Sequence, residues 1–496
     1  MTDIQKTENK DVEQTPNHVQ LVLEPHQRPK SVSKWILLSV QHVFAMFGAT
    51  VLVPMIINQF ANQQVINISM ALFCSGIGTL IYIGLTSAKV PIYLGSSFSY
   101  MTVMGTGYAD WKNAIFIAAF AVGAVYVIVG FIIHWTGSQW VKKVFSPIVI
   151  GPIIIIIGMS AVSSTLKNLG LWSNERGGEI DNGDGTHYPQ WLAILIGVFT
   201  ILVAAVCVLK AKMFFKAIPI LMALAFGYLI TIILHFAFKS QGISLINTSL
   251  ITDVSSWEWY PSFKNVFDVK ASSILPAMVS IVPISMITMT EHLGEHINIG
   301  SLTNRDYIKN PGISRTLMAD GVSIMVAGII GGPVNATYAE NTSVVGMTRV
   351  ASVWAVGLAA IFATAMSFIA PINQIISMIP KPVMGGIGLI LFGMISSNGV
   401  KILIDGKVNF LNAKNIFVIS ITLGIGIGLG VTDTQISVGE NGFKFTGLFL
   451  ATIAGVLLNI LLPDQINDGV FNIKLINKFK NKEFVKEKNK KSRKNK

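Results

Sequence analysis

The sequence has few charged residues for its length and almost no cysteine. Charged residues make up 12% of the 496 residues, hydrophobic residues make up 52%, and the mean hydropathy is +0.60. Soluble domains contain about 25% charged residues, so this composition excludes an ordinary soluble enzyme and predicts a chain that lies mostly in lipid. The only cysteines, Cys74 and Cys207, stand far apart in apolar segments. They predict neither a disulfide framework nor a metal site.

The N-terminal segment 1–33 also lacks a removable signal peptide, because it has no short apolar core followed by a small-residue cleavage site. We therefore expect the first apolar segment to act as the insertion signal. Further apolar segments come near the ~20 residues that span a bilayer. Including the first, the predicted full spans are 34–58, 65–88, 113–135, 147–168, 191–209, 216–238, 275–300, 314–332, 350–378, 382–404, 413–432 and 443–463. Two shorter segments, 91–107 and 333–348, are rich in Gly, Ser, Thr and Asn and predict half-helices with extended stretches. The expected fold is an all-α polytopic membrane protein of fourteen spans.

Positive charge is unevenly divided between the two sides that fourteen spans define. Loops on the side of the N-terminus are rich in Lys and Arg, whereas loops on the other side carry fewer and mix them with acids. Because cytoplasmic loops hold excess positive charge, we expect a plasma (inner) membrane protein with both termini in the cytoplasm. The net charge of +12 comes largely from the end of the chain, 464–496. Beside a membrane such a tail fits anionic lipid better than nucleic acid.

An internal repeat divides the spans into two sets of seven. The pattern Pro-x3-Gly-x6-Gly-Met occurs at 147–159 and again at 382–394, seven spans later. Because seven is odd, the second set must cross the membrane in the opposite sense. The two short segments are then the third span of each set. We expect them to meet near the middle of the bilayer and to form the substrate site.

Two carboxylates stand in segments that otherwise read as lipid-embedded. Glu291 ends an uncharged run that begins at Met278, and Glu340 follows the interrupted segment 331–339. An ionisable side chain at membrane depth is costly and is usually functional. Carboxylates beside broken helices predict a polar cavity inside a transporter. In the first short segment, Phe98 could stack on a flat ligand, although its small neighbours would equally allow close helix packing.

Four stretches resemble the nucleobase-ascorbate transporter family, most closely its uracil permease branch. They are Gln-His-Val-Phe-Ala-Met-Phe-Gly-Ala-Thr-Val-Leu-Val-Pro at 41–54, Gly-Ser-Ser-Phe at 95–98, Glu-His-Leu-Gly at 291–294, and 340–349, which begins Glu-Asn and ends Thr-Arg. The resemblance runs from about residue 34 to 463. It implies uptake of uracil coupled to protons, by a homodimer that needs no cofactor.

The resemblance also implies a core domain and a gate domain that move against each other. The expected divisions are an N-terminal tail 1–33, core spans 34–135 and 271–378, gate spans 136–270 and 379–463, and a basic C-terminal tail 464–496. The permeases of xanthine or urate in the same family, and anion transporters of the same fold, remain alternatives. Two glutamates at the site disfavour an anionic substrate.

Uracil has two carbonyl acceptors and two ring N–H donors, which require backbone N–H groups and carboxylates in a site. By resemblance, Glu291 and Glu340 accept from the ring N–H groups. Backbone at Phe98, next to Ser97, and at Ala339 donates to the carbonyls. In place of the tyrosine of the uracil branch, Phe392 provides the aromatic wall.

Proton coupling is expected at Glu291, Glu295, His42 and His296. In the family the position four after the first glutamate is often His and acts with a His of the first span, here His42. This chain has Glu295 at that position, followed by His296. Burial and two like charges one helical turn apart both favour retention of a proton by the glutamate pair.

The same stretch contains His292-x-x-Glu295-His296, which matches a zinc-peptidase pattern. An intramembrane metalloprotease is therefore an alternative from another class. No third ligand is evident, and hydrogen-bonded histidines inside a helical bundle are the simpler explanation, so we expect no metal site. Asp320, beside Gly321, has two open interpretations: a buried acid or a solvated acid at a helix end.

Overall fold

The structure, a computed structural model, describes most of the chain. The described residues are 20–137, 146–171, 178–182, 185–212, 215, 218–247, 257, 259–431, 436–438 and 443–463. The predicted basic tail 464–496 and the first part of the N-terminal tail, 1–19, lie outside them. The later part of that tail pairs with the residues that follow the second short segment, where Leu23 and Val350 form a β-bridge.

Helices dominate the described chain and pack as two groups. The first group comprises α1 (Val32–Ala61), α2 (Ile68–Leu85), α3 (Met101–Trp111), α4 (Ala114–Thr136), α11 (Ala271–Ile281), α12 (Ser285–Thr303), α13 (Ile313–Ile329), α14 (Ala339–Thr348), α15 (Val353–Met366) and α16 (Ala370–Ser377). In it α13 packs along α4, and α15 packs along both α2 and α1. Single turns join some of these helices: η1 (Phe98–Tyr100), η4 (Val282–Ile284) and the π-helical η5 (Ile308–Gly312).

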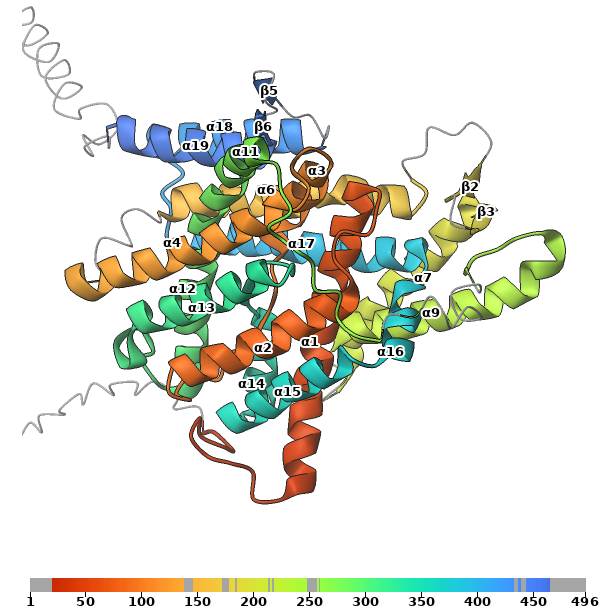
Figure 1. Ribbon diagram of the computed structural model, residues 1–496, viewed down its shortest axis with the longest axis horizontal. Helices are drawn as coiled ribbons and strands as arrows, with labels where there is room; N and C mark the ends of the chain where they lie inside the picture. The colour runs from red at the N-terminus through yellow and green to blue at the C-terminus, as the bar shows by residue number, and fades with distance from the viewer. Residues whose placement is uncertain are drawn as a thin grey trace, which may run out of the picture.

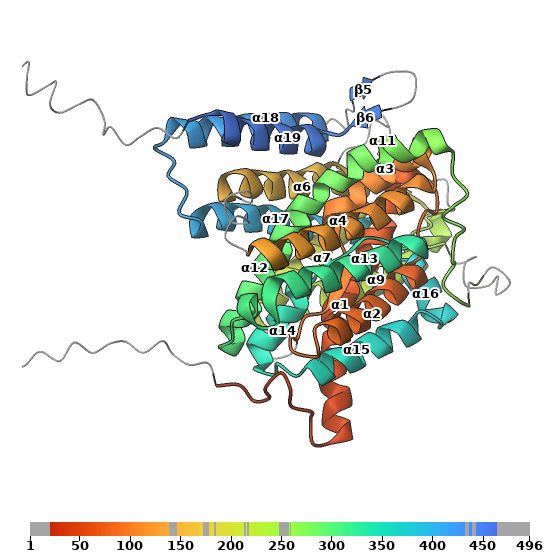
Figure 2. The ribbon, with the colours of Figure 1, turned by 60° about the vertical axis from the view of Figure 1, so that its left-hand side comes forward.

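The second group comprises α6 (Pro147–Asn168), α7 (Gln190–Lys210), α9 (Pro219–Phe238), α17 (Lys381–Asp405), α18 (Ala413–Val431) and α19 (Gly447–Leu461), with the turn η2 (Lys239–Gln241). Its centre is the long contact between α6 and α17, against which α18 and α7 pack (Figure 1). Figure 2 shows α6, α17, α18 and α19 stacked at one edge of the molecule, away from α2 and α15.

On α6 the glycines of the repeated Pro-Gly pattern lie in the contact with α17, whereas on α17 Gly386 of the pattern packs against α7, and the glycine at the α6 contact, Gly399, lies outside the pattern. A side chain at Gly158 would collide with the carbonyl oxygen of Phe392, and a Cβ at Gly399 would lie 2.6 Å from the carbonyl oxygen of Gly151. Glycine is therefore needed on both helices because their backbones approach closely. Three short antiparallel strand pairs complete the fold: β1 (Leu94–Ser96) with β4 (Asn335–Thr337), β2 (Glu179–Asp181) with β3 (His187–Pro189), and β5 (Ile436–Val438) with β6 (Phe443–Phe445).

The helices identify a multi-pass membrane protein. Among the described residues, ten helices are long and apolar enough to cross a bilayer. Each of the fourteen predicted segments contains a helix, but several differ from a simple span. The segment 350–378 is bent by 83° between α15 and α16, where Pro371 stands in the first turn of α16. Helices α3, α14 and α19, at 11, 10 and 15 residues, are shorter than a bilayer requires. The count of fourteen crossings stays a prediction.

Candidate functional site

The two short segments meet, as their place in the repeat predicts. Strands β1 and β4 pair antiparallel, with Gly95 opposite Ala336. Two further backbone hydrogen bonds extend the pair: Ser97 N–H donates to Val334 O at 2.8 Å, and Tyr338 N–H donates to Tyr93 O at 3.0 Å. The strand pair therefore fixes the two breaks in the helical structure against each other, although the paired residues Gly95 and Ala336 are 241 residues apart in sequence (336 minus 95).

A helix begins directly after each strand. The turn η1 starts at Phe98 and continues into α3, while α14 starts at Ala339 and has Glu340 in its first turn. Because the strands are antiparallel, the two helices leave the pair at opposite ends, and their N-termini flank it. The first N–H groups of a helix have no partner within that helix and carry partial positive charge. The backbone N–H groups of Phe98 and Ala339, which are the predicted donors to the substrate, are therefore N–H groups at the start of a helix.

Glu291 lies on α12, which packs against α14 and β4. Ser99 Oγ donates to Glu291 Oε1 at 3.5 Å, a long contact, and Tyr100 Oη lies 3.1 Å from Thr288 Oγ1. Glu340 and Glu295 both lie close enough to Glu291 to repel its charge. The side chains of Glu291, Glu340 and Phe98 are only partly buried. The structure thus brings together carboxylate acceptors, helix N-terminal donors and one aromatic ring, which suits a small planar ligand with both N–H and C=O groups.

The other predicted site residues have different surroundings. Ser97 is buried, and its backbone N–H is already committed to Val334 O. Phe392 is fully buried on α17 at the contact with α6. His42 is buried on α1, where Asn341 Nδ2 donates to its carbonyl oxygen at 3.0 Å and lies 3.3 Å from its Nδ1. His42 is therefore joined to the residue that follows Glu340.

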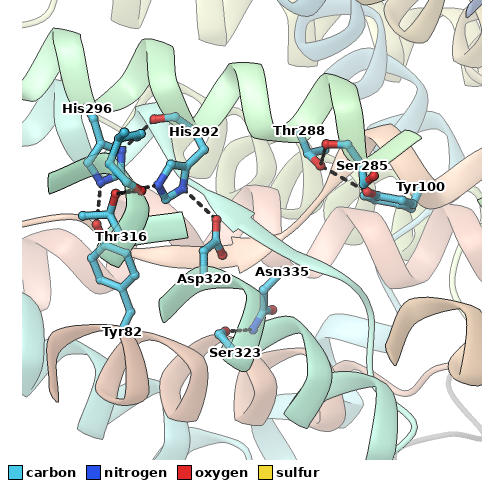
Figure 3. Close-up of polar contacts among 11 residues, drawn as sticks. Tyr82, Tyr100, Ser285, Thr288, His292, His296, Thr316, Asp320, Ser323 and Asn335 are labelled. Carbon is cyan, nitrogen blue, oxygen red and sulfur yellow. Dashed lines mark hydrogen bonds and ion pairs between the residues drawn. The ribbon is translucent and has the colours of Figure 1, made fainter. Parts of the chain in front are cut away.

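A second polar cluster lies beside the carboxylates and is fully buried. His292 Nδ1 lies 2.8 Å from Asp320 Oδ2, and His292 Nε2 lies 3.1 Å from Thr316 Oγ1. His296 Nδ1 donates to His292 O at 2.6 Å, and its Nε2 lies 2.6 Å from Tyr82 Oη. Figure 3 shows these residues converging from α12, α13 and α2. We call Tyr82, His292, His296, Thr316 and Asp320 the histidine cluster.

The histidine cluster settles two open interpretations. Asp320 is a buried acid, not a solvated one, with 0% of its surface exposed. All four ring nitrogens of His292 and His296 have a hydrogen-bond partner, and no group of three metal-ligating side chains occurs among the described residues. The expectation of hydrogen-bonded histidines in a bundle is confirmed. Their place in a helical bundle predicted this role, whereas their spacing had suggested zinc, and nothing in the sequence identified Asp320 or Tyr82 as the partners.

Glu295 lies on α12 next to both the carboxylate site and the histidine cluster. It follows Glu291 by one turn of α12, and Thr342 on α14 and Asn298 lie near its carboxylate. Its Oε2 is buried without a hydrogen-bond partner among the described residues. Glu291 and Glu295 are therefore neighbours on α12, as predicted, and Glu295 Oε2 is an acceptor that none of the described residues uses.

Comparison with known sequences finds a matching family and whole-length relatives. A family model described as a permease family (Xan_ur_permease) matches residues 33–434. The chain is 36% identical to the uracil permease of Bacillus caldolyticus over 446 residues, which are 90% of this chain and 95% of the relative. It is 36% identical to the uracil permease of Bacillus subtilis, covering 86% and 92% of the two chains. It is 31% identical to the uracil permease of Escherichia coli K12, covering 86% and 93%.

Solved structures with low sequence identity have the same class of fold. The transmembrane domain of the cyanobacterial bicarbonate transporter BicA matches with a TM-score of 0.56 at 15% identity, over 87% of this chain and 99% of that one. The inward-facing murine anion transporter Slc26a9 matches with a TM-score of 0.63 at 13% identity, over 88% and 69%. Similarity at this level concerns the fold alone.

Proposed function

This chain belongs to that permease family, the nucleobase-ascorbate transporters, and we propose that it takes up uracil by proton-coupled alternating access. It is a transporter, not an enzyme. In this proposal the first helix group is the core domain, which comprises residues 34–135 and 271–378. The second helix group is the gate domain, which comprises residues 136–270 and 379–463. A homodimer with both termini in the cytoplasm belongs to the same proposal.

One observation carries the choice of substrate: Glu291 and Glu340 stand beside two helix N-termini at the β1–β4 pair. A ring N–H of uracil can donate to each carboxylate, while its carbonyl oxygens can accept from the N–H groups of Phe98 and Ala339. Phe98 is partly exposed and available for stacking. An inorganic anion would find two acids at this position, so the fold shared with anion transporters does not argue for an anionic substrate.

Proton coupling is proposed at Glu291, with Glu295 one turn away and His42 and His296 as further members. A protonated Glu291 favours uracil binding by removing like-charge repulsion from Glu295 and Glu340. Loss of that proton to the cytoplasm lowers the affinity for uracil, because binding of the two ligands is thermodynamically linked. His296 lies in the histidine cluster, so we expect it to act through the position of α12 and not by contact with substrate.

Reconstituted transport tests both parts of the proposal. The purified protein is placed in liposomes with an imposed inward proton gradient and offered labelled uracil, xanthine, urate and sulfate. We expect only uracil to accumulate, and we expect a protonophore to abolish its accumulation. Accumulation that survives the protonophore would remove the proton from the mechanism. Preference for xanthine or urate would assign the chain to another branch of the family. A Glu340→Gln variant is the control for the carboxylate site, because Glu340 is proposed to bind uracil there.

A further inference from the structure

A cleft of about 720 Å³ lies between the two helix groups, at the end of α1 that is distant from the N-terminus. Asn58 and Asn373 line it from the first helix group, and Tyr188 lines it from the second. Neither Glu291 nor Glu340 is among the described residues that line it. On this side of the molecule the space between the groups therefore ends before it reaches the carboxylate site.

The carboxylate site is more accessible from the opposite end of the molecule. On α14 Glu340 is partly buried, whereas Ser343 and Met347, which follow it on the same helix face, are exposed. The helix ends next to Arg349, whose carbonyl oxygen accepts from Val22 N–H of the N-terminal tail at 2.8 Å. Exposure thus increases from the site toward the N-terminal tail. In the proposed topology the structure is therefore open toward the cytoplasm and closed toward the outside.

Two carboxamides join the helix groups on the closed side. Gln59 Nε2 donates to Asn168 Oδ1 at 2.9 Å, and Asn168 Nδ2 donates to Gln59 Oε1 at 3.0 Å. Gln59 lies on α1 of the first group and lines the cleft, while Asn168 is the last residue of α6 in the second group and is 8% exposed. Each residue uses one donor and one acceptor, and the pair carries no charge.

Each of these carboxamides stands on backbone that its own helix group holds in place. Next to Gln59, Asn58 Oδ1 accepts from two backbone N–H groups of the α1–α2 connection, at 2.8 and 3.0 Å. Beyond Asn168, Gln190 Nε2 donates to the carbonyl oxygen of Gly170, which ties the end of α6 to the start of α7. The pair therefore connects two rigid parts, and a movement of the groups that widened the cleft would break it.

We propose that Gln59 and Asn168 form an outer latch, which holds the transporter closed to the outside and is broken and remade in each transport cycle. The latch rests on the proposed function, because it requires alternating access. A neutral pair suits this role, since both carboxamides can bind water when the cleft widens and no unpaired charge is left. Each hydrogen bond contributes a net factor of roughly 2-fold to 12-fold to an equilibrium constant, so the latch favours the closed state without making it permanent.

Hydrogen exchange of the purified full chain, followed by mass spectrometry, tests the latch at equilibrium. Gln59→Ala and Asn168→Ala should each raise exchange at the outer ends of α1 and α6 by at least about fivefold, because both hydrogen bonds are lost. The double alanine variant should add little to either single change, since each already breaks the pair. Gln59→Asn combined with Asn168→Gln keeps one carboxamide on each helix and should restore the wild-type rates.

Asn182→Ala is the matched control for the exchange experiment. Asn182 lines the same cleft, but its Nδ2 donates to Thr186 Oγ1 at 2.9 Å within the second helix group. Its loss should leave exchange at the end of α1 unchanged.

Cross-linking tests whether the latch must open during transport. In proteoliposomes, a short bifunctional methanethiosulfonate joins the thiols of a Gln59→Cys/Asn168→Cys variant, while Cys74 and Cys207 are buried. We expect cross-linking to abolish uracil uptake and a reductant to restore it. Uracil should still bind to the cross-linked protein in detergent, because the cytoplasmic side stays open. An Asn182→Cys/Thr186→Cys variant is cross-linked within the second group and should retain uptake.

The outcomes separate the latch from the proposed function. Uptake that continues after complete cross-linking at 59 and 168 would overturn the latch and leave the proposed function intact. Wild-type exchange rates in both alanine variants would also overturn it, whether or not the cysteine variants are active. Loss of uracil binding on cross-linking would contradict a latch that closes only the outer side. Absence of uracil binding by the wild-type protein would overturn the proposed function itself.

Discussion

Glu291 and His292 are adjacent on α12 but lie in opposite kinds of environment. Glu291 is partly exposed and has one long contact, 3.5 Å, with Ser99. His292 is 1% exposed and has partners on both ring nitrogens, at 2.8 and 3.1 Å. The histidine cluster is closed and all its ring nitrogens are paired, although Asp320 Oδ1 has no partner among the described residues, whereas the carboxylate site is more exposed and loosely bonded. Figure 3 shows the ring nitrogens of His292 and His296 each engaged by a neighbouring group.

The difference matches two jobs that a transporter must divide between its residues. A carboxylate that binds and releases a ligand should not give up strong internal hydrogen bonds in each cycle. The helix that carries this carboxylate must nevertheless keep its orientation, which a buried hydrogen-bond network can provide. We therefore expect substitutions in the histidine cluster to affect folding, and substitutions at the carboxylate site to affect binding or coupling.

Asp320→Ala should have the largest effect. It leaves His292 Nδ1 buried without its partner, which costs about 1–3 kcal/mol, and it also removes the packing of a fully buried side chain. Thermal unfolding can be followed with a thiol-reactive dye, because Cys74 and Cys207 are both buried. Asp405→Ala, at the exposed end of α17, should change stability by less than about 0.5 kcal/mol. An Asp320→Ala protein that unfolds like the wild type would remove the structural role of the cluster.

Glu340→Gln should weaken uracil binding by about 1–3 kcal/mol while folding is retained. Glutamine keeps one carbonyl acceptor but loses the charge, and its NH2 group can oppose a ring N–H. Isothermal titration measures the change in Kd, roughly 5-fold to 150-fold. Glu24→Gln, which removes a charge from a surface pair with Arg305, is the control and should bind as the wild type does. Unchanged affinity in Glu340→Gln would exclude it as a direct ligand.

The contrast between the two clusters was only partly predictable. The meeting of 91–107 with 333–348 followed from the repeat, although their pairing as strands did not, and the functional importance of Glu291 and Glu340 followed from the cost of charge in lipid. Asp320 could not be assigned, because its pairing with His292 depends on how α13 is rotated against α12. The bend at Pro371 was missed because apolar composition continues through it, so hydropathy alone reads one span there.

Glu295→Gln should change coupling more than binding. It removes a negative charge one turn from Glu291, so the proton at Glu291 is held less firmly and the optimum of uptake should move toward acid. Substrate binding should survive, since uracil is expected to contact Glu291 and not Glu295. Glu291→Gln, by contrast, should damage both. The measurement is the pH profile of gradient-driven uptake and of counterflow. A Glu295→Gln profile that superimposes on the wild type would show that Glu291 and Glu295 do not retain a proton between them.

Ser99→Ala should have the smallest effect, and it gives the most direct test of the comparison when set beside Tyr82→Phe. Each change removes one hydroxyl that contacts α12, but Ser99 Oγ is 3.5 Å from Glu291, whereas Tyr82 Oη is 2.6 Å from His296 Nε2. Because a 3.5 Å contact contributes little, Ser99→Ala should alter unfolding by less than about 0.5 kcal/mol and uracil affinity by less than about threefold. Tyr82→Phe leaves a buried ring nitrogen unpaired and should cost about 1–3 kcal/mol of stability. Equal losses in the two variants would mean that the carboxylate site is as tightly bonded as the histidine cluster, and the division of labour along α12 would fail.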